Sequence, residues 1–407
     1  MSSGAEILAI LRERGFVQQI NDEAGLSGLL GRGPVTFYCG FDPTASSLHV
    51  GSMVPLVAMG HLARAGHRPI AVLGGGTTMI GDPSGKTELR QMLTRETIAA
   101  NARAIEPQVR RFLGDAGDRA LLVDNADWLL PLNYIEFLRD IGRHFSVNRM
   151  LAAEAYKLRL EKGLSFIEFN YQILQAYDFL TLKRRHGCLL QIGGDDQWGN
   201  ILAGADLIRR LDQAEAFALT FPLITTAAGA KMGKTAAGAV WLAADRTSPF
   251  DFYQYFVNVD DRDVGRFLKL LTFLPMNEIE KLAALQGAEL RVAKQALAFA
   301  ATEIVHGKEA AESAQQAAQA AFGGGGAGEL VPTFEATVGV KIVDLLAAAG
   351  LAASKSAARR LVEQGGVKVG DRKISSVEDM LKAEDVGSDG VLLHAGKKHL
   401  KRIVLKG

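Results

Sequence analysis

The stretch VTFYCGFDPTASSLHVGS (35–52) decides the fold class. Its first six residues, VTFYCG (35–40), form an apolar run that is typical of a buried strand. Pro43 then turns the chain, and a helix is expected to begin near His49. A strand that leads through a loop into a helix points backbone N–H groups and the positive end of the helix dipole into the loop, which favours phosphate. The same spacing also fits a capped helix with an exposed histidine.

Three further apolar runs follow the same pattern, each leaving into a loop rich in Gly, Asp or Asn: PIAVLGG (69–75), ALLVDN (120–125) and CLLQIGG (188–194). Helical periodicity fills the segments between them, at about 50–66, 92–113, 133–141, 165–184 and 197–212. Strands that alternate with helices predict an α/β fold, with a Rossmann-like parallel sheet covered by helices on both faces. Ligands bind such sheets at the carboxyl ends of the strands.

The rest of the chain predicts further domains. A catalytic domain is expected over 1–245, with a helical insertion at about 125–187 between two halves of the sheet. A helical domain follows at 246–322. The run GGGGAG (323–328) can neither sustain a helix nor pack a strand, so 323–335 is expected to be a linker. The remaining residues, 336–407, predict a small α+β unit with a basic helix, a Gly-Gly stop and a strand.

Charge is distributed unevenly along the chain. Residues 338–407 hold 13 Lys and Arg against 8 Asp and Glu, a net charge of +5, whereas the remaining 33 basic and 37 acidic residues give −4. A basic tail on a mildly acidic body indicates that phosphate binding is at least partly delegated to the C-terminus, and a locally basic solvated surface is the alternative.

Composition and segment patterns favour a cytoplasmic protein. The chain contains only two cysteines, Cys39 and Cys188, and neither belongs to a CxxC pair, which favours a reducing compartment and no structural zinc. Charged residues interrupt the N-terminus, and no run of about 18 apolar residues occurs, so neither a signal peptide nor a membrane span is predicted.

The glycine-rich segment GGGTTMIGDPSGKT (74–87) superficially matches the phosphate loop of kinases and ATPases. That loop requires four residues between its first glycine and the Gly-Lys pair. Here only three residues separate Gly81 from Gly85, and Pro83 removes one of the N–H groups of the cradle. We therefore reject this interpretation, which leaves a strand exit that presents Asp82, Lys86 and Arg90.

Polar residues line one face of an otherwise apolar helix. Tyr171, Gln175 and Asp178 are spaced at i, i+4 and i+7, so they share a face. A polar stripe on a buried helix needs partners, because burying it unpaired is costly. Either internal hydrogen bonds satisfy it or it lines a polar ligand pocket.

Two more segments carry chemistry. In IGGDDQWGN (192–200), Asp196 stands at a helix start, where an acid suits a ribose hydroxyl and equally well a helix N-cap. KMGKT (231–235) places two ammonium groups on a short loop, an arrangement suited to a triphosphate. Taken alone, it is only a basic loop.

The order and spacing of these segments resemble the class I aminoacyl-tRNA synthetases. PTASSLHVGS is similar to their HIGH-type element, and KMGKT to their KMSKS-type loop. YCGFDPT, IGDPSGK, FNYQILQAYDFL and IGGDDQWGN resemble, in this order, the bacterial tyrosyl-tRNA synthetase family, from about Ile7 to the C-terminus. The tail resembles a small RNA-binding domain shared with a ribosomal protein. The resemblance implies activation of tyrosine with ATP and transfer to tRNA(Tyr), by a homodimer that contacts its partner through the insertion.

The resemblance also implies roles for individual residues. Tyr38 and Asp178 would bind the substrate phenol, and the amino-acid head group would contact Asp82, Tyr171, Gln175 and Gln197. The ribose would meet Cys39 and Asp196, and the ATP site would further include Gly40, Asp42, Gly51, Ser52, Gly194, Met232 and Gly233. The γ-phosphate would meet Thr44 and His49, and pyrophosphate would be held by Lys86, Arg90, Lys231, Lys234 and Thr235. Transfer RNA would meet Lys355, Arg359 and Arg360. Mg²⁺ is expected to accompany ATP, without a metal bound by the protein.

Two residues depart from the family pattern. Ser52 stands where the HIGH element ends in histidine, and Asp195 stands where serine is expected, placing a second carboxylate beside Asp196 that is expected to alter the ribose site. Two other functions are considered. The first is a nucleotidyltransferase of the same superfamily without tRNA, against which the C-terminal unit argues. The second is a catalytically silent tRNA- or rRNA-binding paralogue, against which Thr44, His49, Lys231 and Lys234 argue. Tyr38 and Asp178 also disfavour a tryptophan-specific enzyme.

Overall fold

The computed structural model of the chain describes residues 4–84, 92–114, 120–152, 154–161, 163–227, 229, 232–235, 238–322, 331, 333–352, 354–387, 390–396 and 399–406. The chain divides into two units. The first comprises residues 1–48, 52–224 and 269–273, and the second comprises residues 49–51, 225–268 and 274–407. The domain boundaries expected from the sequence stay predictions.

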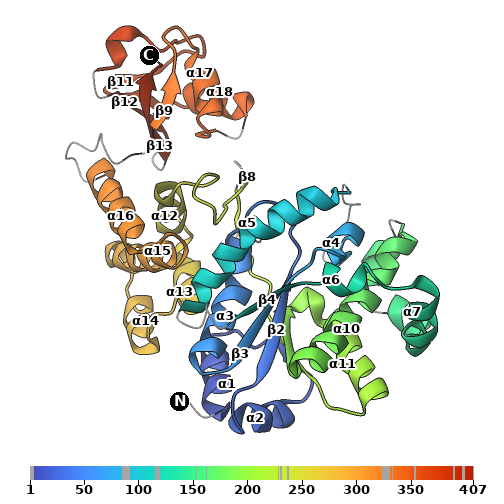
Figure 1. The fold of residues 1–407 in the computed structure, drawn as a ribbon. Coiled ribbons are helices and arrows are strands. Elements are labelled where there is room, and N and C mark those ends of the chain that lie inside the picture. The colour runs from blue at the N-terminus through green and yellow to red at the C-terminus, as the bar shows by residue number, and fades with distance from the viewer. Residues whose placement is uncertain are drawn as a thin grey trace. The chain divides into compact units, whose positions relative to one another are not determined.

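A six-stranded sheet forms the centre of the first unit (Figure 1). Its strands are β1 (Gln19–Ile20), β2 (Thr36–Phe41), β3 (Arg68–Leu73), β4 (Leu121–Asp124), β5 (Cys188–Gly194) and β6 (Phe217–Phe221). They are arranged in the order β1-β6-β5-β2-β3-β4, with β6 to β4 parallel and β1 antiparallel to β6. The predicted parallel α/β sheet is therefore confirmed, and the antiparallel edge strand is an addition to it.

Helices cover both faces of this sheet because of its strand order. The connections from β2 to β3 and from β3 to β4 run in one direction along the sheet, whereas those from β4 to β5 and from β5 to β6 run in the other. Since such crossovers are right-handed, the two sets of helices lie on opposite faces. One set contains α3 (Met53–Arg64) and α5 (Arg95–Leu113), and the other α10 (Phe166–His186) and α11 (Trp198–Asp212). Figure 1 shows the pairs on either side of the strands.

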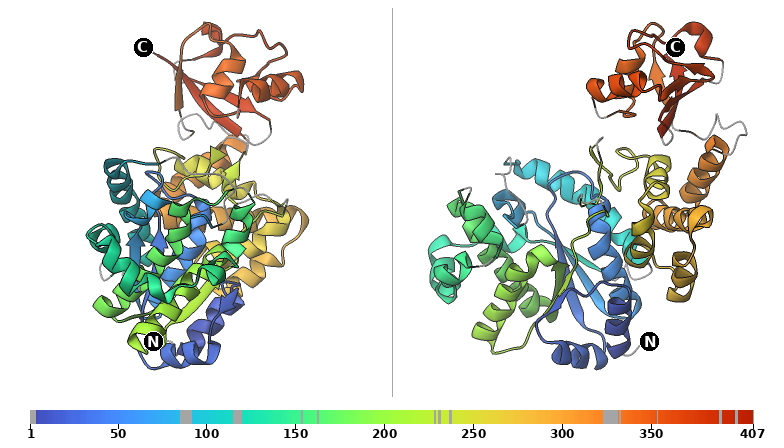
Figure 2. Two further views of the ribbon diagram at one scale, coloured as in Figure 1. Left: turned by 90° about the vertical axis from the view of Figure 1, so that its right-hand side faces the viewer. Right: turned by 180° about the vertical axis from the view of Figure 1, so that it is seen from behind.

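Short helices complete the first unit. Near the N-terminus and after β3 they are α1 (Gly4–Glu13), α2 (Glu23–Gly31) and α4 (Thr77–Ile80). Between β4 and α10 they are α6 (Ala126–Leu129), α7 (Tyr134–Asp140), α8 (Val147–Leu151) and α9 (Glu154–Leu160), in the region where the sequence predicts a helical insertion. Figure 2 shows these helices from two further sides.

A buried ion pair fixes the last of these short helices to the start of α10. Arg159 Nη2 donates to both carboxylate oxygens of Glu168, at 3.0 and 2.9 Å, and to the Gly163 carbonyl at 3.3 Å. Glu168 also forms a capping box with Ser165. Only 2% of the Arg159 side chain and 8% of that of Glu168 are exposed, so removing either partner would leave a buried charge uncompensated.

The second unit contains the predicted helical region. Its helices are α12 (Pro249–Val257), α13 (Val264–Leu271), α14 (Met276–Ala283), α15 (Leu290–His306) and α16 (Lys308–Phe322), and the last residues of α13 are counted in the first unit. Small buried alanines, such as Ala298, Ala301 and Ala314, allow α12, α15 and α16 to pack closely.

The last part of the chain forms a five-stranded sheet beside two helices. The strands are β9 (Thr333–Ala336), β10 (Val367–Val369), β11 (Arg372–Lys373), β12 (Val391–Ala395) and β13 (His399–Leu405), in the order β11-β10-β12-β13-β9. The helices are α17 (Ile342–Ala348) and α18 (Lys355–Glu363). The predicted basic helix followed by a strand is confirmed as α18 and β10.

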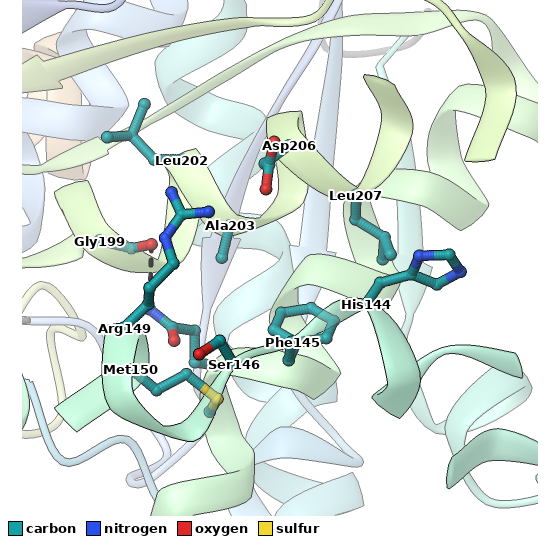
Figure 3. A pocket seen from close by; sticks show the side chains of 11 residues that line it. His144, Phe145, Ser146, Arg149, Met150, Gly199, Leu202, Ala203, Asp206 and Leu207 are labelled. Carbon is teal, nitrogen blue, oxygen red and sulfur yellow. Dashed lines mark hydrogen bonds between the residues drawn. The ribbon is translucent and has the colours of Figure 1, made fainter. Parts of the chain in front are cut away.

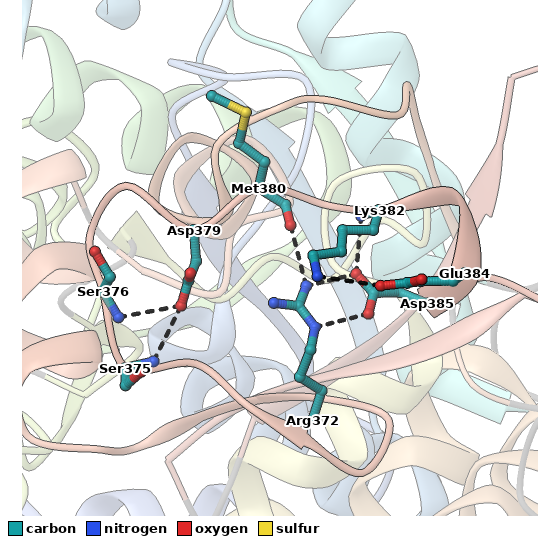
Figure 4. A network of polar contacts seen from close by, with 8 residues as sticks. All are labelled: Arg372, Ser375, Ser376, Asp379, Met380, Lys382, Glu384 and Asp385. Carbon is teal, nitrogen blue, oxygen red and sulfur yellow. Dashed lines mark hydrogen bonds and ion pairs between the residues drawn. The ribbon is translucent and has the colours of Figure 1, made fainter.

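Polar side chains hold a long loop onto this small sheet (Figure 4). Arg372 Nε donates to Asp385 Oδ1 at 2.7 Å, and the Lys382 backbone N–H donates to Asp385 Oδ2 at 2.8 Å. Asp379 Oδ2 accepts from the backbone N–H groups of Ser375 and Ser376, both at 3.1 Å. Together these bonds fix the loop between β11 and β12.

No helix in the described ranges is long and apolar enough to cross a membrane.

Candidate active site

The strand order reverses between β2 and β5, so the topological switch point of the sheet lies between these two strands. In open α/β sheets, ligands bind at the carboxyl ends of the strands at such a point. The end of β2 carries Tyr38, Cys39 and Gly40, with Asp42 following directly. The end of β5 carries Gly194, and the 3₁₀ turn η4 (Asp195–Gln197) follows at once. The sheet topology thus brings together two segments that lie far apart in the sequence.

Asp178 is the buried acid of this region. It is 3% exposed, and two side chains donate to it: Trp128 Nε1 to Oδ1 at 2.7 Å and Asn125 Nδ2 to Oδ2 at 3.0 Å. Burial raises the pKa of Asp178 from 3.8 to about 7, and the two donors oppose that rise, while Asp42 and Asp124 add to it. The carboxylate is therefore poised to change charge near neutral pH.

Tyr38 stands close to this acid. Its ring meets that of Phe179 edge-on, with centroids 5.3 Å apart, and the residue is 1% exposed. Its hydroxyl has no hydrogen-bond partner among the described residues, and the same holds for Oε1 of Gln191, its register neighbour on β5. Burial, followed by the nearby Asp178 carboxylate, raises the pKa of Tyr38 well above 10. Two buried polar atoms without partners indicate a polar ligand rather than a closed core.

A second chain of hydrogen bonds starts at Asp42. Thr77 Oγ1 donates to its Oδ1 at 2.9 Å, and the Tyr171 hydroxyl donates to its Oδ2 at 3.2 Å. Asn125 connects this chain to Asp178, because Asn125 Nδ2 also donates to Thr77 Oγ1 at 3.0 Å. Two of the three residues in the predicted polar stripe, Tyr171 and Asp178, are therefore satisfied by side chains from other elements.

Gln197 lies in a third network, in η4. Its Nε2 donates to Asp82 Oδ2 at 2.8 Å and to Asp196 Oδ2 at 3.3 Å. Asn200 Nδ2 donates to Gln197 Oε1 at 3.1 Å, and the backbone N–H of Ser84 donates to Asp82 Oδ1 at 2.9 Å. The structure thus brings Asp82, Asp196 and Gln197 together.

The second unit contains residues 49–51 of the HIGH-like segment and the described residues 232–235 of the basic loop. The Val50 N–H donates to the Val240 carbonyl at 2.9 Å, and the Val240 N–H donates to the Gly233 carbonyl at 2.8 Å. His49 pairs with Trp241 through an isolated β-bridge. Residues 49–51 thus lie beside the segment that follows KMGKT.

The helix predicted to begin near His49 begins a few residues later in the structure. A 3₁₀ turn, η1 (Val50–Ser52), comes first, and α3 begins at Met53, with Ser52 as its N-cap residue. His49 and Thr44 are exposed, and the Gly51 N–H donates to His49 Nδ1 at 3.0 Å.

Several predicted residues remain to be placed. Gln175 is half-buried on α10, and Met232 and Gly233 are buried. Residues 234–235 form β7 (Lys234–Thr235), a strand that pairs with β8 (Gly238–Ala239), and the structure describes only the backbone there. Lys86, Arg90 and Lys231 lie outside the described residues. Lys355, Arg359 and Arg360 are exposed on α18, where Lys355 Nζ pairs with Asp344 Oδ1 at 2.7 Å.

The sequence analysis missed three residues that organise this region: Thr77, Asn125 and Trp128. Asn125 and Trp128 follow β4 directly, in VDNADW (123–128), so the strand-end pattern that identified Asp82 and Asp196 could have indicated them. Thr77 lies in the glycine-rich segment after β3, from which the sequence analysis selects only Asp82, Lys86 and Arg90 as candidate site residues.

A hollow of about 240 Å³ lies between the insertion and α11 (Figure 3). It is lined by Phe145 and Met150 of the insertion, and by Ala203 and Asp206 of α11. At its edge, Gln172 Nε2 donates to the Gly199 carbonyl at 3.1 Å, which ties α10 to the first turn of α11. None of the predicted substrate-binding residues lines this hollow.

Residues 31–323 match the family model of the class I tRNA synthetases (W and Y), and residues 340–386 match the S4 domain. The chain is 51% identical over 403 residues to the tyrosine–tRNA ligase of Caldanaerobacter subterraneus subsp. tengcongensis, covering 98% of this chain and 99% of the relative. It is 50% identical over 406 residues to that of Clostridium botulinum, covering 99% and 100%. A solved C-terminally truncated mitochondrial tyrosyl-tRNA synthetase of Aspergillus nidulans superposes with a TM-score of 0.70 at 31% identity, covering 79% of this chain and 95% of the other.

The family match over residues 31–323 shows that the chain is a class I tRNA synthetase, which agrees with a parallel sheet whose strand order reverses beside the polar cluster, and the chain also contains an S4 domain. Within that class, the chain belongs to the tyrosine–tRNA ligase family of bacterial type.

The pKa of Asp178 makes a prediction about stability. Because burial raises this pKa from 3.8 to about 7, the native state retains a proton that the unfolded state releases, so the contribution of Asp178 to stability falls as pH rises from about 4 through about 7. Asp178→Asn cannot ionise and lacks this loss. We therefore expect the stability of the wild type relative to Asp178→Asn to fall between about pH 4 and about pH 7, by at most about 1.4 kcal/mol per pH unit. Urea unfolding followed by tryptophan fluorescence measures it. Parallel curves for the two proteins across this range would contradict the raised pKa.

Proposed function

We propose that this chain activates L-tyrosine with ATP to form tyrosyl-adenylate and pyrophosphate, and then transfers tyrosine to the 3′-terminal adenosine of tRNA(Tyr). The observation that carries this proposal is that Tyr38 and Asp178 are both buried at this site. The Tyr38 hydroxyl has no hydrogen-bond partner among the described residues, and burial raises the pKa of the Asp178 carboxyl to about 7. The relatives that cover nearly the whole chain are tyrosine–tRNA ligases, which supports the same reaction.

The pair suits a phenol. A phenolic hydroxyl can accept from the Tyr38 hydroxyl and add a donor to Asp178, whose oxygens already accept from Trp128 and Asn125. Phenylalanine would leave the Tyr38 hydroxyl without a partner, and an unpaired buried polar group costs about 1–3 kcal/mol. An indole offers a donor but no acceptor. Selection of tyrosine therefore follows from hydrogen-bond pairing. The head group of the amino acid would contact Asp82, Tyr171, Gln175 and Gln197.

The ATP ribose is assigned to Cys39 and Asp196. Burial raises the pKa of the Cys39 thiol to about 12, so the thiol stays neutral and keeps its proton as a weak donor. The phosphates are assigned to Thr44, His49, Lys86, Arg90, Lys231, Lys234 and Thr235, with Gly40, Asp42, Gly51, Ser52, Gly194, Met232 and Gly233 completing the ATP contacts.

The chemistry would consist of positioning and charge stabilisation. The tyrosine carboxylate is already ionised when it attacks the α-phosphorus of ATP, so activation needs no general base. Pyrophosphate leaves as the bond between the α-phosphorus and the bridging oxygen to the β-phosphate breaks. Mg²⁺ would enter with ATP as part of the substrate. The reaction would take place in the cytoplasm, consistent with two buried, free cysteines.

The first test is the exchange of labelled pyrophosphate into ATP without tRNA. We expect exchange with tyrosine and little with phenylalanine or tryptophan, because only tyrosine satisfies Tyr38 and Asp178. Asp178→Ala should lose most of this activity, whereas Asp206→Ala, which removes a surface acid paired with Arg209 and Arg210, should keep it. Asp178→Ala with nearly wild-type kcat/KM would contradict the pocket assignment. If no amino acid supports pyrophosphate exchange, although the protein is folded and binds tRNA, the result would favour a catalytically silent RNA-binding function.

We further infer that α18 contacts tRNA phosphates. Lys355, Arg359 and Arg360 are exposed on one short helix of the S4 domain, and the residues from 338 onward carry a net charge of +5. Arginine and lysine near phosphate displace condensed counterions, so the affinity they provide depends on salt.

Replacing all three residues with alanine should weaken tRNA binding and reduce the dependence of log affinity on log salt concentration by about 1 for each phosphate that α18 no longer neutralises. Pyrophosphate exchange without tRNA should be unchanged. Filter binding at several salt concentrations measures the slope, and Lys308→Ala, which removes an exposed lysine on α16, is the control. An unchanged slope in the triple variant would refute the assignment.

The insertion is proposed as the dimer surface. Among the apolar residues between 135 and 145, Ile135 and Leu138 are exposed, whereas Phe137, Ile141 and Phe145 pack into or against the core. Tyr134 and Phe166 are also exposed, by 58% and 70%. Several large apolar side chains exposed within one region indicate a protein–protein interface.

The variant Tyr134→Glu/Ile135→Glu should convert a dimer into a monomer, because it places charges in an apolar interface that would have to bury them. Sedimentation velocity at several concentrations measures the mass. Val292→Glu replaces an apolar side chain that is 55% exposed on α15, outside the insertion, and should leave the mass unchanged. A double variant that remains dimeric would place the interface elsewhere.

A further inference from the structure

Asp195 occupies the position at which the family pattern has serine, and the structure gives this aspartate specific partners. Its Oδ1 accepts a hydrogen bond from Gln19 Nε2 at 2.7 Å and another from Thr220 Oγ1 at 2.9 Å. Gln19 belongs to the edge strand β1, and Thr220 belongs to β6, where it is fully buried. One carboxylate oxygen therefore joins the start of η4 to two neighbouring strands.

The donors also match the charge of Asp195. A carboxylate oxygen accepts hydrogen bonds more strongly than a hydroxyl does, and two donors converge on Oδ1 of Asp195. A serine side chain is one bond shorter and offers a weaker acceptor. The aspartate is thus suited to span from η4 to both strands.

Asp196 and Gln197, the next two residues, are held differently. Gln197 is fixed by Asp82 and Asn200, at 2.8 and 3.1 Å, independently of Asp195. The hydrogen bond between Gln197 and Asp196 is longer, at 3.3 Å. Since Asp195 directly precedes Asp196 in η4, fixing Asp195 to β1 and β6 also fixes the backbone from which the Asp196 side chain extends.

We propose that Asp195 is a positioning residue that fixes the Asp196 carboxylate against the ribose of ATP through its bonds to Gln19 and Thr220. This inference rests on the proposed function, because it takes Asp196 to be the ribose acid. It separates two roles within η4: Asp195 faces the sheet edge and holds the turn, and Asp196 meets the nucleotide.

Ribose analogues test this role directly. If Asp196 bonds a ribose hydroxyl, the enzyme prefers ATP over the deoxy-ATP that lacks this hydroxyl, and Asp196→Ala loses the preference. Pyrophosphate exchange with ATP, 2′-deoxy-ATP and 3′-deoxy-ATP, for the wild type and Asp196→Ala, identifies the hydroxyl concerned. The same ratio of kcat/KM values is then measured for variants of Asp195.

We expect Asp195→Ala to reduce the preference for ATP and to raise the KM for ATP about tenfold, the size of effect expected from removing roughly one to two hydrogen bonds. The KM for tyrosine should change by less than about twofold, because Gln197 keeps its own anchors. Asp195→Asn should restore most of the preference, since its amide oxygen can accept the same two bonds. Thr220→Val and Gln19→Ala, which each remove one donor, should have intermediate effects.

If Asp195→Ala keeps the wild-type preference for ATP over deoxy-ATP and the wild-type KM for ATP, the proposal is overturned and the proposed function stays intact. Equal losses for tyrosine and ATP would also overturn it, because they indicate a general loss of structure. If Asp195→Ala does not fold, Thr220→Val and Gln19→Ala carry the same test. If the wild type shows no pyrophosphate exchange with tyrosine, the proposed function itself is contradicted.

Discussion

The organisation of the candidate site depends on the burial of one carboxylate, that of Asp178, with two side-chain donors. Asn125 is central to this arrangement, because its Oδ1 accepts from the Gly76 N–H at 2.8 Å while its Nδ2 donates to Thr77 and Asp178. A single amide thereby connects the end of β4, the start of α4 and the middle of α10. Since a buried carboxylate is costly unless it is paired, these elements can adopt their positions only together.

Much of the fold could be predicted because its signals are local. Apolar runs of six or seven residues that end in Gly, Asp or Asn identified β2, β3, β4 and β5, and periodicity identified the long helices between them. The strand β1 could not be found in this way. It has only two residues, Gln19 and Ile20, and it exists because β6 offers an edge about 200 residues later, which no local pattern records.

In the candidate site, too, features with a local sequence signal could be predicted and features that depend on the tertiary fold could not. The spacing of Tyr171 and Asp178 on α10 showed that they share a face, and the structure supplies each with a partner. Their partners Asp42, Asn125 and Trp128 come from other strand ends, so only the tertiary fold decides which strand-end residue reaches which helix. The partners of Asp195 could not be predicted for the same reason: its neighbour in sequence is Asp196, but its hydrogen bonds come from Gln19 and Thr220.

The strand order has a consequence for how the chain folds during synthesis. β2, β3 and β4 are neighbours in both sequence and space, so they can pair once residue 124 has left the ribosome. The other side of β2 is paired only after the helices from α6 to α10 have been made and β5 arrives, more than 60 residues later. During this interval β2, which is central in the finished sheet, has an open edge able to pair with another chain. The helical segment between β4 and β5 thus lengthens the period in which one edge of β2 is unpaired.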